Sequence, residues 1–133
     1  MPIPSVGGGF QLGDGNLNEI FLGEMADPQT ATATATLTAA QVTGGMLVAN
    51  PSTAAASYTL PTVALTEAVL TNAKVGSTFE LALVNLGTSS GAVTVLVGTG
   101  WTIVGSAVVA ITSSARFMAR KSDVGAWVLY RVA

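Results

Sequence analysis

The residue types that most often do chemistry in proteins are scarce in this chain, which has neither His nor Cys. A Ser nucleophile would need a general base, and without His the candidates are Lys74 and Lys121. Neither lysine stands in a Ser-x-x-Lys sequence. A zinc site needs Cys or His in most cases. We therefore expect no nucleophilic catalysis and no zinc centre.

The seven carboxylates offer the remaining chemistry. The start of a calcium-binding loop is suggested by Asp14-Gly15-Asn16. No acid follows at the EF-hand spacing, so an Asx-type turn is favoured there. Glu67, Glu80 and Asp123 offer a carboxylate pair for glycoside cleavage, yet each has a plainer role. We place Glu67 in the first turn of a short helix, Glu80 on the outer face of a strand, and Asp123 in a turn.

Residues 98–100 read Gly-Thr-Gly, as in part of a phosphate-binding loop. They lead into a strand pattern rather than into a helix, so the helix N-terminus that would bind an anion is missing. We predict a β-turn there. The sequence therefore predicts a protein that is not an enzyme and that uses no cofactor and no metal.

Charge is unevenly distributed, although the net charge is only −2. The first 27 residues hold four acids and no base, and all five bases lie from Lys74 onward. Arg116, Arg120 and Lys121 lie close together, and we predict that they form ion pairs with a protein partner or with the acidic N-terminal segment. Solubilising surface charges are the alternative. Phosphate-binding stripes are usually denser and interleaved with aromatic residues, so no nucleic-acid partner is expected.

The composition predicts that part of the surface is buried in an assembly. The chain has 133 residues, which suits one domain, and 50% of them are hydrophobic while 9% are charged. Ordinary soluble domains have about 25% charged residues. An uninterrupted apolar run such as residues 107–111 is far shorter than the about 20 residues of a membrane span, and the residues from Met1 to Pro4 do not begin a secretory signal. Obligate interfaces are depleted in charge. The alternative is a monomer with a neutral Thr/Ser surface.

Residues 1–28 are predicted to form an extended N-terminal attachment arm. The segment is too rich in Gly for regular structure, yet too apolar for a solvated tail. Asp27-Pro28 marks its boundary with the rest of the chain. A segment folded back on its own domain is the alternative. The apolar side chains that we expect to contact a partner are Ile3, Val6, Phe10, Leu12, Ile20, Phe21 and Leu22.

Residues 29–133 are predicted to form one β domain. Thr and Ala alternate from Thr30 to Thr38, which indicates a strand, with a low-complexity linker as the alternative. Leu65, Val69 and Leu70 indicate one short helix that ends near Gly76. Further strands are expected at 46–50, 57–60, 78–86, 92–97, 101–104, 107–112, 115–121 and 126–132. The side chains expected to face the core are Phe79, Leu81, Leu83, Val93, Val95, Val97, Phe117 and Ala119.

These elements do not alternate as βαβ units, which argues against a parallel sheet. The fold class that we predict is all-β: an antiparallel β-sandwich, jelly-roll-like, with one short helix and an extended N-terminal arm. A barrel is the second choice.

Several turn and strand motifs of the last hundred residues carry a family resemblance. They are Leu37–Val42, Tyr58–Thr62, Val75–Phe79, Val84–Gly87, Gly98–Trp101 with Gly105, and Ser114–Phe117. In these motifs the chain resembles β-sandwich proteins of tailed-bacteriophage virions, namely capsid decoration (cement) proteins and head fibres. The resemblance implies a homotrimer on the outer surface of the capsid that bridges subunits of the major capsid protein. The absence of Cys suits assembly in the reducing cytoplasm of a bacterial host.

The expected function is therefore that of a structural virion protein that decorates and stabilises a capsid. The alternative is a head- or tail-fibre module that binds a host receptor or carbohydrate, and a third reading is a free-standing carbohydrate-binding sandwich. Sugar sites usually present exposed aromatic side chains. The chain offers Trp101, Trp127, Tyr58 and Tyr130, which all lie in expected strands.

Overall fold

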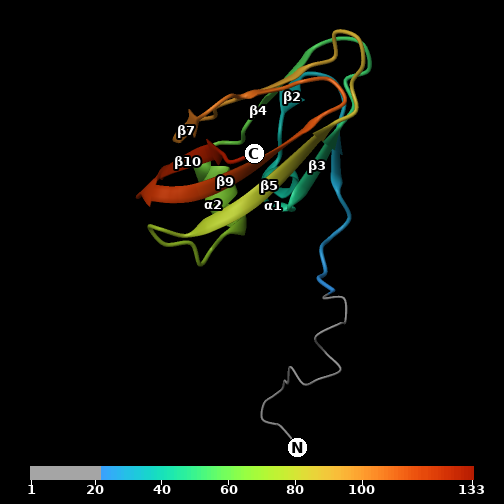
Figure 1. Cartoon of the computed structure of the whole chain (residues 1–133). Helices are drawn as coiled ribbons and strands as arrows, with labels where there is room; N and C mark the ends of the chain where they lie inside the picture. The colour runs from blue at the N-terminus through green and yellow to red at the C-terminus, as the bar shows by residue number, and fades with distance from the viewer. Residues whose placement is uncertain (1–21) are drawn as a thin grey trace, which may run out of the picture.

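The computed structural model describes residues 22–133, and residues 1–21 lie outside the described part (Figure 1). The elements in chain order are β1 (Gln29–Ala31), β2 (Ala35–Thr36), α1 (Ala39–Thr43), β3 (Met46–Ala49), β4 (Ala56–Thr59), α2 (Val63–Val69), β5 (Thr78–Asn85), β6 (Val93–Leu96), β7 (Trp101–Val104), β8 (Val108–Val109), β9 (Ser114–Asp123) and β10 (Ala126–Arg131). The protein is mostly β, as predicted.

The strands form two sheets that share one hydrophobic core. The six-stranded sheet has the order β1-β3-β5-β9-β10-β7, and the four-stranded sheet has the order β2-β4-β6-β8. Side chains from both sheets meet in a single buried cluster, whose largest members are Trp127, Tyr58, Phe117, Leu47, Leu60, Leu81, Leu83 and Leu129.

The predicted antiparallel pairing is wrong for much of the molecule. β1–β3, β3–β5, β10–β7, β2–β4 and β4–β6 are parallel pairs, whereas β5–β9, β9–β10 and β6–β8 are antiparallel. β1, β3 and β5 lie in the six-stranded sheet, and β2, β4 and β6 lie in the four-stranded sheet. The chain therefore passes through the second sheet each time before it returns to the first sheet in the same direction. The second sheet thus serves as the crossover connection that parallel strands require.

The structure has two helices where one was predicted. Each helix carries the chain from the four-stranded to the six-stranded sheet, α1 after β2 and α2 after β4. α1 begins at a capping box, in which the Thr38 hydroxyl accepts from the Gln41 N–H at 3.2 Å and the Gln41 Oε1 accepts from the Thr38 N–H at 2.8 Å. The Thr-x-x-Gln spacing is a helix start signal in the sequence, although only five residues follow in the helix.

The predicted helix exists, but its buried face differs from the expectation. α2 starts after the N-cap Thr62 and buries Val63 and Thr66. Leu65 and Val69, on which the helix prediction depended, are 60% and 54% exposed. The hydrophobic spacing therefore identified the element without identifying the face that packs.

The alternating Thr/Ala segment is divided between the two sheets instead of forming one strand. β1 ends at Ala31 and β2 begins at Ala35. The corner between them is held from β4, because the Tyr58 hydroxyl donates to the Thr32 carbonyl at 2.6 Å and the Ser57 N–H donates to the Thr34 hydroxyl at 3.0 Å.

The period of two predicted the core-facing residues of the longer strands well. Leu81, Leu83, Val93, Val95, Phe117 and Ala119 are buried. Phe79 is only partly buried, although it packs against the core. Val97 is 48% exposed, which contradicts the prediction, because β6 ends one residue earlier.

Candidate functional site

The Glu67 carboxylate contacts side chains of two strands. Glu67 lies beyond the first turn of α2, contrary to the prediction. Its Oε2 lies 2.7 Å from the Lys121 Nζ and accepts from the Trp127 Nε1 at 2.9 Å. The hydrogen bond from Lys121 and then that from Trp127 lower the pKa of Glu67 below its ordinary value of 4.5. The charged carboxylate therefore joins α2 to β9 and β10.

Of the three bases predicted to form an ion-pairing surface, Lys121 is thus paired within its own chain. Arg116 and Arg120 remain exposed on β9, one on each side of Met118. Glu80 lies opposite Met118 on β5, and its Oε1 is 3.8 Å from the Arg116 Nε. Both side chains of that pair are more than half exposed, so the pair contributes little to stability.

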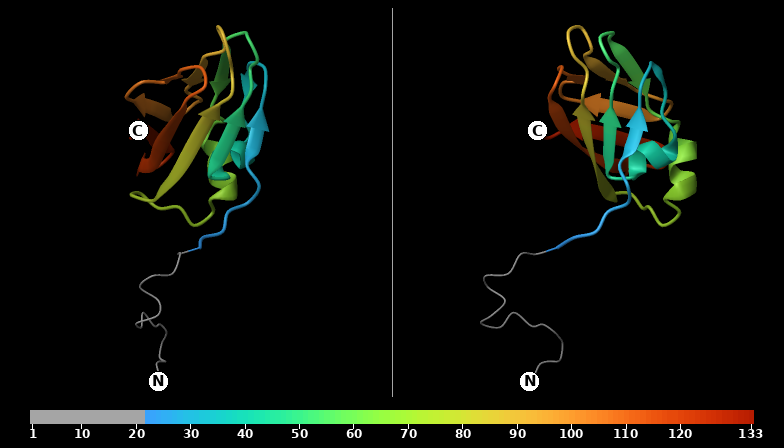
Figure 2. Two further views of the ribbon diagram at one scale, coloured as in Figure 1. Left: turned by 45° about the vertical axis from the view of Figure 1, so that its right-hand side comes forward. Right: turned by 90° about the vertical axis from the view of Figure 1, so that its right-hand side faces the viewer.

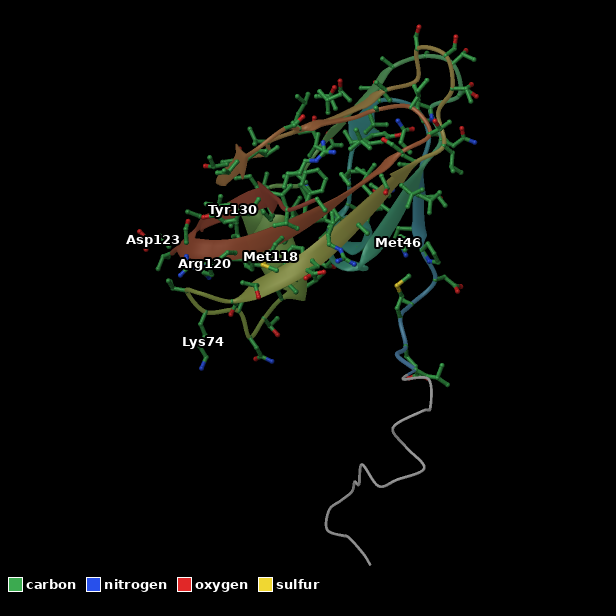
Figure 3. The ribbon with its side chains drawn as sticks, in the orientation of Figure 1. Met46, Lys74, Met118, Arg120, Asp123 and Tyr130 are labelled. Atoms are coloured by element: carbon green, nitrogen blue, oxygen red, sulfur yellow. The ribbon has the colours of Figure 1, made fainter. Side chains whose placement is uncertain are left out.

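The outward-facing side of the six-stranded sheet, which we call the outer face, carries exposed apolar side chains beside Glu80, Arg116 and Arg120. The cross-strand register places Met46 beside Ala82 and Val48 beside Val84, and it places Tyr130 beside Met118. Figure 3 shows Met46 on β3, Met118 and Arg120 on β9, and Tyr130 on β10. The apolar side chains of the outer face are Met46, Val48, Ala82, Val84, Val104, Met118, Val128 and Tyr130, and all of them are partly or fully exposed.

A shallow hollow lies on the outer face. It has a volume of about 360 Å³ and is lined by Met46, Ala82, Val84, Ser114, Ala115, Arg116 and Ala133. Its lining combines apolar side chains with Arg116. A hollow of this kind suits an apolar side chain with an acidic neighbour.

Residues 22–28 lead away from the sandwich and are exposed throughout (Figures 1 and 2). Leu22, one of the predicted contact residues, is 91% exposed, and Met25 is 56% exposed. The other predicted contact residues lie outside the described part of the chain: Ile3, Val6, Phe10, Leu12, Ile20 and Phe21.

The large aromatic side chains are mostly interior. Trp101, Trp127 and Tyr58 are buried. The Trp127 ring lies 5.5 Å from the Phe79 ring and 5.8 Å from the Trp101 ring, as measured between centroids. Tyr130, at 37% exposed, is the member of the predicted set that reaches the surface, and it does so on the outer face.

The Gly-Thr-Gly segment forms a turn, as predicted, and it takes the chain from β6 to β7. The Trp101 N–H donates to the Gly98 carbonyl at 3.1 Å. A side chain at Gly98 would place its Cβ 2.3 Å from the Leu60 carbonyl oxygen, so glycine is required by close packing. The segment has a structural role at the corner of the sandwich.

Within residues 22–133, no group of three or more His, Cys, Asp or Glu side chains is placed to hold a metal ion. In the same part of the chain, no helix has the length and apolar character to cross a membrane. Comparisons with protein-family models, with curated proteins and with solved structures find no match to this chain.

Proposed function

We propose that this protein is a structural subunit of a phage virion that decorates the outer face of the capsid and stabilises it by bridging subunits of the major capsid protein. The observation that carries the proposal is the N-terminal segment, which leaves the sandwich with Leu22 and Met25 exposed to solvent. Large apolar side chains on an extended segment are costly to leave in water unless a partner, either the capsid or a neighbouring copy, covers them.

The body of the molecule supports a structural role. Its strongest charged contact, between Glu67 and Lys121, ties elements of the fold together. Its outer face carries a group of exposed apolar side chains, which an assembly would remove from water. A homotrimer on the capsid surface, and a location in the virion, are parts of this proposal.

The energetics favour a multivalent attachment. Burial of an apolar side chain such as Ile3 or Phe10 contributes about 1.5–3 kcal/mol. Ordering of the backbone costs about 1–2 kcal/mol per residue, so a single arm gives little net affinity. Three linked arms raise the avidity by a factor on the order of 10²–10⁴, which favours a trimer over a monomer as the decorating unit.

The fibre alternative receives less support from the aromatic residues. A receptor or sugar site would use exposed aromatic rings beside polar side chains. Trp101, Trp127 and Tyr58 are buried in the core, and Tyr130 lies on the apolar outer face. We therefore favour decoration over receptor binding.

The first test is the copy number in purified particles that carry the protein. Quantitative gel analysis should find hundreds of copies per particle, as bridging of capsid subunits across a whole shell requires. A handful of copies would contradict decoration and would favour a fibre.

The second test concerns the arm. Ile3→Ser/Phe10→Ser should strongly reduce cosedimentation with shells that lack the protein, because the substitutions remove the apolar contacts proposed for the arm. Val124→Ser is the matched control, since Val124 is 85% exposed in the turn between β9 and β10. Equal occupancy by the double variant and the control would show that the sandwich, not the arm, binds the capsid.

A further inference from the structure

The two parts of the chain carry opposite net charges. Residues 1–28 hold four acids and no base, whereas residues 29–133 hold five bases and three acids and have a net charge of +2. All four acids lie between Asp14 and Asp27, and residues 1–13 contain no charged side chain. The arm therefore has an uncharged first half and an acidic second half.

The outer face has the complementary chemistry. Arg116 is held only by the exposed 3.8 Å pair with Glu80, and Arg120 forms no ion pair within residues 22–133. Met118 lies between the two arginines on β9, Val128 lies beside Arg120 on β10, and Ala82 lies beside Arg116 on β5. The outer face thus presents two cationic side chains among apolar side chains.

The acidic half of the arm carries both acidic and apolar side chains, which complement the arginines and the apolar side chains of the outer face. Between its four acids it carries Leu17, Ile20, Phe21, Leu22 and Met25. Fourteen residues in extended form reach roughly 46–50 Å, and six strands at a spacing of about 4.8 Å span roughly 24 Å. The segment is long enough to cross the whole outer face.

The direction of residues 22–28 indicates whether the arm covers its own sheet or the sheet of a neighbouring copy. Residues 22–28 leave β1 away from the sandwich, and every one of them is exposed (Figure 2). A segment with this course meets the surface of a neighbouring molecule more readily than its own sheet. We propose that residues 14–27 of one copy lie across the outer face of the six-stranded sheet of an adjacent copy, with their carboxylates paired to Arg116 and Arg120.

This inference rests on the homo-oligomer within the proposed function and not on the capsid. It assigns two tasks to the arm: residues 14–27 join the copies, and the uncharged residues 1–13 extend beyond them to the capsid. The interface should be sensitive to salt, because its charged contacts lie at the protein surface.

The first experiment compares single charge reversals by light scattering of the full chain across a concentration series. Arg120→Glu should raise the dissociation constant of the oligomer by about tenfold or more. Lys74→Glu makes the same charge change at an exposed base in the loop before β5, and it should leave the constant within about twofold of the wild type. Equal effects of the two substitutions, or a wild type that is monomeric, would overturn the inference.

The second experiment mixes two chains that each fail to assemble alone. Arg116→Glu/Arg120→Glu reverses the charge of both arginines of the face, and Glu19→Lys/Glu24→Lys neutralises the net charge of the arm, which then holds two acids and two bases. In the mixture, the unchanged acidic arm of the first chain meets the unchanged arginines of the second chain, so the average mass should rise above that of either chain alone. If the arm instead covers its own face, or neither, the mixture will remain monomeric, and this would overturn the inference.

Circular dichroism of each variant shows whether its sandwich is folded. If the face variant is unfolded, the arm variant alone tests the inference, because its substitutions lie outside the sandwich. The inference still requires that the arm variant fail to assemble. Capsid cosedimentation separates the two proposals. If the protein forms an oligomer through its arms but does not bind shells, this inference stands and the decoration function is overturned. If the protein is a monomer that decorates shells, the decoration function stands and this inference is overturned.

Discussion

At the scale of single residues, the most consequential contact is one that no local pattern indicates. Glu67 and Lys121 are 54 positions apart in the chain, and they meet because α2 packs beside the turn-proximal end of β9. Trp127 adds its indole N–H to the same carboxylate oxygen. One partly buried anion thus holds a helix and two strands in place, and its lowered pKa is the electrostatic consequence.

Substitution of Glu67 tests this role. Glu67→Ala removes both hydrogen bonds and should lower the free energy of unfolding by about 1.5–3 kcal/mol, as measured by urea titration at neutral pH. Glu80→Ala is the matched control. Its 3.8 Å pair with Arg116 is exposed, so the change there should stay below about 1 kcal/mol. A Glu80 effect as large as that of Glu67 would contradict the assigned roles.

The pH dependence of stability provides a second check on Glu67. Its pKa is lower in the folded protein than the ordinary value of 4.5, so its contribution is fully present above that value. The contribution is lost as the pH falls through the folded-state pKa. The stability difference between wild type and Glu67→Gln should therefore shrink as the pH is lowered from 6 toward 3. A difference that does not change over this range would show that the Glu67 charge is not involved.

At the scale of elements, the corners between the sheets decide the topology. The chain leaves the four-stranded sheet through α1, through α2, and then through the tight turn at Gly98. The two helical corners follow equivalent sites, since Thr38 and Thr62 both cap a helix shortly after a buried leucine, Leu37 or Leu60. The third corner has no helix and depends on the close approach of Gly98 to the chain at Leu60.

Gly98→Ala should therefore destabilise the sandwich, because its Cβ would lie 2.3 Å from a backbone oxygen that cannot swing away. We expect a loss of about 1–3 kcal/mol or more, which thermal or urea unfolding will measure. Gly23→Ala, in a segment where the added Cβ meets nothing within 4 Å, is the control and should be neutral. A neutral Gly98→Ala would show that the corner can relax.

At the scale of the whole molecule, the surface chemistry indicates association. The chain is 50% hydrophobic and 9% charged, and its outer face presents methionine, valine and tyrosine side chains to solvent. A lone domain with such a face is prone to associate, and a specific assembly removes that surface from water. The proposed trimer and the proposed arm contact are two aspects of the same requirement.

The wild-type protein should accordingly behave as a homotrimer, with three times the 13.3 kDa mass of the chain in light scattering at micromolar concentration without capsid. The reason is the burial of the outer face and of the apolar arm residues. Raising the salt concentration should weaken the oligomer, because the proposed arginine–carboxylate pairs are screened. A monomer mass at all accessible concentrations would contradict the proposed oligomer.

The sequence by itself determined the properties that depend on local periodicity and composition. The alternation in segments such as Leu81–Leu83 and Phe117–Ala119 identified the core side of the strands, and this is so because one buried face imposes a period of two on any sheet. The turn at Gly98 was predicted from its residue types. The Thr-x-x-Gln spacing of Thr38 and Gln41 also indicates the start of α1.

Only the tertiary structure decided which strands pair and in which direction. A strand with one buried face has the same sequence pattern in a parallel and in an antiparallel ladder, so β1, β3 and β5 gave no indication of their parallel order. The pairing of Lys121 with Glu67, and the burial of Val63 rather than Leu65, likewise depend on packing between segments that are distant in the chain. Such contacts are selected by the shape of the assembled core, which no window of sequence contains.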